Sequence, residues 1–112
     1  MVKLFDMSTR ERIEIKIRDN LTPAHMEVVN ESHLHNVPEG SESHFKVVVV
    51  SEVFRGETLI GRHRRVNQLL REEFGTGLHA LALHTMTPEE WFKKGGAVPR
   101  TPDCMGGGRK TD

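Results

Sequence analysis

Residues 33–51 read HLHNVPEGSESHFKVVVVS, and they join an irregular part of the chain to its most strongly β-forming part. The first half contains Pro38 and Gly40, which break regular structure, so we expect a long loop. The second half begins at His44 and contains a run of valines, whose branched side chains favour a strand. Loops of this length in small domains are more often functional than idle. The stretch therefore predicts a histidine-bearing loop that runs into a rigid strand, an arrangement suited to binding a metal or a partner.

The residues before this loop are expected to form one helix and one strand. Residues 26–32 fit a first strand. Residues 8–21 are ambiguous, because isoleucines that alternate with charged residues fit a half-buried strand. The same residues fit a helix with a hydroxyl cap at its start, since Ile13, Ile17 and Leu21 are four residues apart. The residues alone leave both interpretations open.

The residues after the second strand predict a helix, a third strand and a short last helix. Thr58 can cap the first of these helices, and Gly75 to Gly77 would end it. Its expected apolar face consists of Leu59, His63, Val66, Leu70 and Phe74. Residues 78–86 alternate as a strand, with His79, Leu81 and Leu83 on one face and Leu78, Ala80, Ala82 and His84 on the other.

The last helix is marked by residues 87–90, TPEE, which form a capping box with proline at the first helical position. Trp91 and Phe92 are expected to anchor this helix on the rest of the protein. The order of elements is then helix, strand, strand, helix, strand, helix, which is an α+β pattern.

Composition fits one small domain. The chain has 112 residues, enough for a modest core, and we expect an N-terminal extension at 1–8, a domain at 9–94 and a flexible tail at 95–112. Sixteen basic residues balance sixteen acidic ones, so no net field attracts the whole molecule to nucleic acid or to a membrane. No apolar run approaches the ~18 residues of a membrane span, and the first residues lack a signal or presequence pattern, so we expect a cytoplasmic protein.

Cysteine usage points away from disulfides and from catalysis. The single cysteine, Cys104, excludes an internal disulfide framework and favours a reducing compartment. Cys104 stands in a glycine-rich tail with no nearby base in the sequence, so an activated thiolate is not expected. We therefore expect a protein that is not an enzyme.

Three runs of the chain resemble the BolA family. They are NESHLHNVPEGSESHFKVVVVSEVFRGE at 30–57, GRHRRVNQLLREE at 61–73 and GLHALALHTMTPEEW at 77–91. The resemblance covers residues 10–92 and implies a BolA-like α+β fold, related to the type II KH domain, with a three-stranded sheet. It also favours the helix for residues 8–21.

The resemblance implies a metal site and a partner. Family members share a two-iron two-sulfur cluster with a monothiol glutaredoxin and glutathione, and the matching ligand positions in this chain are His35 in the loop and His79. Imidazole suits iron, and His33 is close enough in the sequence to replace His35. From the residues alone, His79 is instead a half-buried side chain beside Leu81 and Leu83. Sequence spacing does not show that His35 and His79 converge.

The other histidines are expected to be structural or superficial. His63 lies on the expected apolar helix face, and His44 opens the second strand. His84 faces small residues on the third strand, and His25 stands near the surface at the entrance of the first.

Nucleic acid is the alternative partner that the resemblance implies, because bacterial members are described as transcriptional regulators of stress and cell shape. The basic candidates are Lys46, Arg62, Arg64, Arg65 and Arg71. Helical spacing puts Arg62 and Arg65 on one flank and Arg64 and Arg71 on another, and a solvated helix face is the simpler interpretation. KH domains clamp nucleic acid with a Gly-x-x-Gly loop, but residues 55–61, RGETLIG, lack that spacing. No membrane partner is expected, and a weak homodimer is left open.

Overall fold

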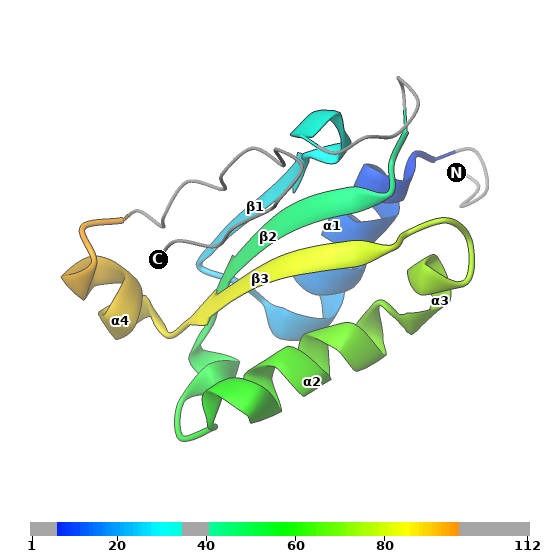
Figure 1. Cartoon of the computed structure of the whole chain (residues 1–112). Helices are drawn as coiled ribbons and strands as arrows, with labels where there is room; N and C mark the ends of the chain where they lie inside the picture. The colour runs from blue at the N-terminus through cyan, green and yellow to red at the C-terminus, as the bar shows by residue number, and fades with distance from the viewer. Residues whose placement is uncertain (1–6, 35–40, 97–112) are drawn as a thin grey trace.

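The computed structural model describes residues 7–34 and 41–96. The elements follow in the order α1 (Thr9–Leu21), β1 (His25–Asn30), the 3-10 helix η2 (Ser32–Leu34), β2 (His44–Val50), the 3-10 helix η3 (Glu52–Phe54), α2 (Leu59–Leu69), α3 (Arg71–Phe74), β3 (Ala80–Met86) and α4 (Pro88–Lys93). The strands form one sheet in the order β1-β2-β3, in which β1 is antiparallel and β3 parallel to the central β2 (Figure 1). The predicted α+β fold with a three-stranded sheet is confirmed, with α3, η2 and η3 as additions.

Helix α1 settles the ambiguity of residues 8–21. The Ser8 hydroxyl accepts a hydrogen bond from the Glu11 amide, and the Glu11 carboxylate accepts one from the Ser8 amide. This capping box satisfies amides that would otherwise lack partners at the start of a helix. Ile13, Ile17 and Leu21 then fall on one buried face, as the four-residue spacing predicts.

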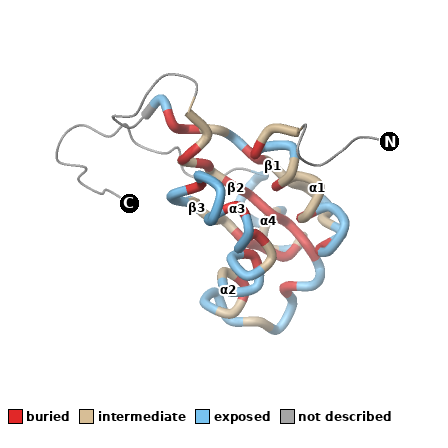
Figure 2. The backbone as a smooth tube through the Cα atoms, turned by 90° about the vertical axis from the view of Figure 1, so that its right-hand side faces the viewer, coloured by how far each residue is buried: buried red, intermediate tan, exposed pale blue. Residues whose placement is uncertain are grey.

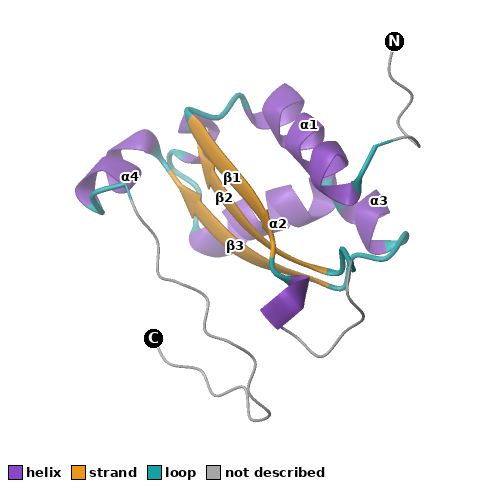
Figure 3. Ribbon diagram, turned by 90° about the horizontal axis from the view of Figure 1, so that it is seen from above, coloured by secondary structure: helices purple, strands orange, loops and turns teal. Residues whose placement is uncertain are grey.

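The two faces of the sheet are covered unequally. Helices α1 and α2 lie on one face, where the main core is formed (Figure 3). On the other face α4 covers only one end, where Trp91 packs against a second, smaller cluster of Val48, Val50 and Met86. Strand β2 is buried between these layers and is largely red in Figure 2. By alternation along the paired strands, the rest of the second face, which we call the open face, carries Glu27, Val29, His44, Lys46, Ala80, Ala82 and His84.

The predicted helix from Thr58 to Phe74 is confirmed as far as Leu69 and is interrupted after that residue. The backbone leaves helical geometry at Leu70 and starts a new turn, α3. Leu59 and Phe74 are exposed, and the buried face instead includes Arg62, Val66, Leu70 and Glu73. The new turn brings the buried carboxylate of Glu73 against α1, a contact between distant parts of the chain that helical periodicity cannot predict.

Glu73 joins α3 to α1 through two ion pairs. One carboxylate oxygen lies 3.0 Å from Arg12 Nε and the other 2.9 Å from Lys16 Nζ, while only 3% of the Glu73 side chain is exposed. Burial by itself raises the pKa of Glu73, but the hydrogen bonds from Lys16 and Arg12 outweigh it and hold the pKa below its usual value. The buried charge is therefore compensated, and it ties the two helices together.

Arg62 and Glu90 join α2 to α4 across the end of β3. Arg62 Nη1 lies 2.7 Å from Glu90 Oε1, and Nη2 lies 3.2 Å from Oε2, a two-pronged ion pair. Arg62 also donates to the carbonyl oxygens of Thr85 and Glu57. Glu90 accepts a bond from the amide of Thr87, which confirms the predicted capping box. The bond from Arg62 and that from Thr87 lower the pKa of Glu90 to about 2.

The expected anchors of α4 behave differently. Trp91 packs against the sheet and stacks on His25, with 4.7 Å between ring centroids. Phe92 is 84% exposed, so its predicted role as an anchor is wrong. A helix this short presents one side to the sheet, and two adjacent residues cannot both lie on that side.

Glu90→Gln should remove an acid-sensitive part of the stability. Because the folded pKa of Glu90 lies near 2, below its usual value of 4.5, the stabilisation is complete above pH about 4.5 and is lost as the pH falls toward 2. Urea unfolding followed by Trp91 fluorescence should show a lower midpoint for the variant at neutral pH and a narrowing difference in acid. Glu89→Gln on the same helix is the control. A difference between wild type and Glu90→Gln that does not change with pH would contradict this assignment.

Candidate functional site

His79 lies at the end of the sheet, immediately before β3. Its amide and that of Ala80 both donate to the carbonyl oxygen of Ser43, at 2.8 and 3.1 Å. Two amides on one oxygen interrupt the strand alternation, as in a β-bulge. Leu78 is consequently buried in the core and His79 is exposed, so the alternative interpretation of His79 as a half-buried side chain beside Leu81 and Leu83 is wrong.

The ring of His79 lies beside that of His44, the first residue of β2. The two ring centroids are 6.2 Å apart and the planes are within 7° of parallel. His44 Nδ1 lies 2.8 Å from the hydroxyl oxygen of Ser43. Two imidazoles therefore meet where the central and third strands begin, and we call this the histidine corner (His44 and His79).

The loop between β1 and β2 is closed at its base by polar side chains. Ser32 is buried, and its hydroxyl oxygen accepts hydrogen bonds from the amides of Ser43 and His44, at 3.0 and 3.1 Å. Asn30 spans the same gap, because its side chain accepts from the Ser32 amide and donates to the Ser41 carbonyl oxygen. These bonds hold both ends of the loop against the histidine corner.

Of the two loop histidines, His33 lies within the described residues, where it is exposed in η2 at the loop base. His35, the predicted loop ligand, and Cys104 fall outside residues 7–34 and 41–96. Within those ranges, no group of three or more histidine, cysteine, aspartate or glutamate side chains is arranged to hold a metal ion.

The remaining histidines take part in packing. His63 is half-buried on α2, and burial followed by the charge of Arg62 lowers its pKa. His84 lies on the open face, where burial and then the charge of Lys46 lower its pKa. His25 lies 2.8 Å through Nε2 from a Glu27 oxygen. None of these three rings joins the histidine corner.

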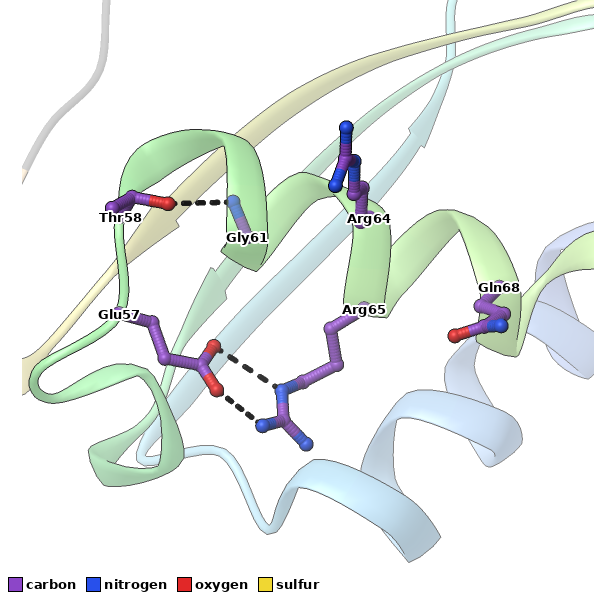
Figure 4. A pocket seen from close by; sticks show the side chains of 6 residues that line it. All are labelled: Glu57, Thr58, Gly61, Arg64, Arg65 and Gln68. Atoms are coloured by element: carbon purple, nitrogen blue, oxygen red, sulfur yellow. Dashed lines mark hydrogen bonds and ion pairs between the residues drawn. The ribbon is translucent and has the colours of Figure 1, made fainter.

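The five basic candidates for nucleic acid do not form one surface. Arg62 is buried and engaged internally, so the prediction of a solvated flank with Arg65 is wrong. Arg65 forms an ion pair with Glu57, which lowers the pKa of that carboxyl group (Figure 4). Arg64 and Arg71 are exposed on α2 and α3, and Lys46 lies on the open face instead.

Arg64 borders an open hollow of about 490 Å³ on the outer side of α2. The hollow is lined by Glu57, Thr58, Gly61, Arg64, Arg65 and Gln68. Arg64 points away from the Glu57–Arg65 pair (Figure 4). The Thr58 hydroxyl caps the helix by accepting from the Gly61 amide at 3.0 Å. Glu57 offsets part of the positive charge here through its ion pair with Arg65.

Arg62→Met should destabilise the fold, whereas Arg64→Met should not. Loss of Arg62 leaves the carbonyl oxygens of Thr85 and Glu57 and the Glu90 carboxylate without their donor, a cost of about 2–3 kcal/mol because Glu90 is partly solvated. The exposed Arg64 should change the free energy of unfolding by less than about 0.5 kcal/mol. Urea titration measures both, and equal losses in the two variants would contradict the internal role of Arg62.

Comparison with known proteins identifies the family. The family model described as BolA, BolA-like protein, matches residues 17–90. The chain belongs to the BolA-like family. It is 53% identical to the Escherichia coli protein named DNA-binding transcriptional regulator BolA, over 91% of this chain and 97% of that one. A Vibrio cholerae protein of the same name is 52% identical over 88% and 93% of the two chains.

A solved BolA-like structure supports the fold as well. The solution structure of BolA1 from Mus musculus matches with a TM-score of 0.76 and 39% identity, covering 89% of this chain and 80% of that one. Among the described residues, no helix is long and apolar enough to cross a membrane.

Sequence reasoning missed the loop base and the contact between His44 and His79. Serine and asparagine side chains often hydrogen-bond to nearby backbone at turns. The several serines and asparagines around the loop could therefore have indicated the hydrogen bonds at its base. The second depends on the parallel register of β2 and β3, in which His44 pairs with Ala80. The pattern of residues along each strand does not reveal that register.

Proposed function

We propose that this BolA-like chain holds a two-iron two-sulfur cluster jointly with a monothiol glutaredoxin, which contributes a cysteine and glutathione. This chain would contribute His79 and His35. The observation that carries the proposal is the position of His79, which is exposed at the end of the sheet while its backbone is fixed to Ser43. A neutral imidazole on a rigid strand end is a good iron ligand.

Chain length supports His35 as the second ligand. His35 follows Ser32 by three residues, so the two Cα atoms lie at most about 11 Å apart. Ser32 bonds directly to the first residues of β2, beside which His79 lies. The chain therefore limits how far His35 can lie from Ser32, and it limits the exposed His33 more tightly still.

The potential ligands at the histidine corner fit a cluster that is shared with a second protein better than one that this chain alone would enclose. His44 and His79 are the two imidazoles that meet at the corner, and the described residues bring no third potential ligand to them. A cluster bound here would need ligands from the loop and from a second protein. The cluster supplies the iron–sulfur unit to be delivered or sensed, and this chain holds and orients it in the cytoplasm without catalysing a reaction.

His79→Ala should abolish the joint complex. Wild-type protein mixed with a monothiol glutaredoxin, glutathione, iron and sulfide should give a visible circular dichroism spectrum distinct from that of the glutaredoxin alone, because nitrogen ligands alter the charge-transfer bands. The variant should lack that spectrum, whereas His84→Ala, on the same strand and on the open face, should retain it. A wild-type spectrum from His79→Ala would contradict the ligand assignment.

The loop ligand should be less critical. His35→Ala should weaken the complex without abolishing it, because His33 lies two residues away, and the double variant should lose more. Lowering the pH toward about 5 should also release the cluster, since a protonated imidazole cannot coordinate iron.

DNA binding is a second candidate function, favoured by the names of the bacterial relatives. The described residues that best support it are the exposed Arg64 and Arg71, since Arg62 and Arg65 are already paired. Contact with three or four phosphates from a neutral protein would be weak and would depend strongly on salt.

Charge reversal should locate the DNA surface. Arg64→Glu with Arg71→Glu should weaken binding to duplex DNA and flatten the slope of log affinity against log salt, which we expect to be about −3 in the wild type. Arg65→Gln is the matched control, because Glu57 already neutralises that side chain. Fluorescence anisotropy over a salt series measures the slope. Binding that is insensitive to salt and survives the double reversal would place the site on another surface.

A further inference from the structure

His79 has a fixed backbone and an exposed ring. The two bonds to Ser43 hold its amide, but among the described residues the one ring contact of His79 is the stack on His44. An exposed side chain samples several rotamers, and freezing it on ligation costs binding energy. A neighbouring group that already holds the ring in one orientation would remove part of that cost.

His44 has the placement and the rigidity to hold that ring. It pairs with Ala80 in the parallel register, so its side chain stands one residue away from His79 across the strands. The ring planes are within 7° of parallel, and the 6.2 Å centroid separation lies within the range of offset aromatic pairs.

His44 is itself fixed on three sides. Its amide donates to the buried hydroxyl of Ser32, and its Nδ1 lies 2.8 Å from the Ser43 hydroxyl. It also opens β2, whose residues Val47 to Val50 are fully buried. The ring is half-buried, in contrast to the exposed His79. His44 is therefore the fixed member of the pair and His79 the member that can face a partner.

We propose that His44 is a positioning residue for His79, whose ring it fixes through an offset, near-parallel ring contact in the orientation that ligation requires. This inference rests on the proposed function of His79 as a cluster ligand, but the contact itself is a property of the free protein. The contribution is that of an aromatic ring, so a phenyl group should replace the imidazole of His44.

The free protein tests the contact without any cluster. Three-bond couplings at the His79 β-protons, measured by nuclear magnetic resonance, should report one dominant rotamer in the wild type and in His44→Phe, and averaging in His44→Ala. His25→Ala is the matched control, because it removes another stacked histidine from the opposite end of the same face. Far-ultraviolet circular dichroism checks that each variant is folded, because His25→Ala would itself alter the fluorescence of the stacked Trp91. Identical His79 couplings in wild type and His44→Ala would overturn the proposal.

The complex with glutaredoxin tests the consequence. His44→Ala should shorten the lifetime of the joint cluster spectrum about three- to tenfold, the factor expected for freeing one side chain, while His44→Phe and His25→Ala stay near wild type. Loss of the spectrum in His44→Phe as severe as in His44→Ala would overturn the proposal and make His44 a ligand. If the couplings change as expected but the wild type forms no joint cluster, the positioning contact stands and the proposed function fails.

Discussion

The parallel pairing of β2 with β3 is the constraint on which the site and the core both depend. Parallel strands begin at the same end of a sheet, so His44 and His79 meet although they lie far apart in the sequence. The pairing also requires a crossover between the strands, and α2 fills it on one face, where it closes the main core with α1. The same arrangement leaves most of the open face uncovered, because one crossover helix covers only one side of the sheet.

Charge is used inside this molecule to join helices. Arg62 and Glu90 fasten α4 to α2, and Glu73 fastens α3 to α1 through Arg12 and Lys16. Buried pairs of this kind contribute little net energy against apolar replacements but leave a large cost when one partner is removed. A basic helix in the sequence of this protein is therefore poor evidence for a basic surface. Arginine is a common phosphate ligand, but Arg62 is buried and instead holds α2 to α4 through Glu90.

Local signals predicted most of the helices and strands but did not predict which of their faces are buried. The capping box at Thr87 depends on residues three apart, and the valine run needs only its own branching, so the last helix and the second strand were predictable. For residues 8–21 the local pattern fitted both a helix and a strand, and the resemblance to the family favoured the helix that forms. The break at Leu70 and the exposure of His79 depend on Glu73 reaching α1 and on Ser43 accepting two amides. Both are contacts between residues far apart in the chain. For the site, the resemblance to the family predicted His79. Its neighbour His44 became apparent only from the parallel register of β2 and β3.

The two proposed functions use different residues, although α3, which carries Arg71, lies near the end of the sheet where β3 begins (Figure 1). The histidine corner lies where β2 and β3 begin, whereas α2 begins near the end of the sheet where these parallel strands finish (Figure 1), and the exposed Arg64 is in the middle of that helix. Helix α2 also packs on the core face, and His44 stands on the open face. A glutaredoxin at the corner would therefore leave Arg64 uncovered unless it reached around the edge of β3. Competition between the two partners would then have to come from their size or from a change in this chain, because no described residue of the corner belongs to the basic set.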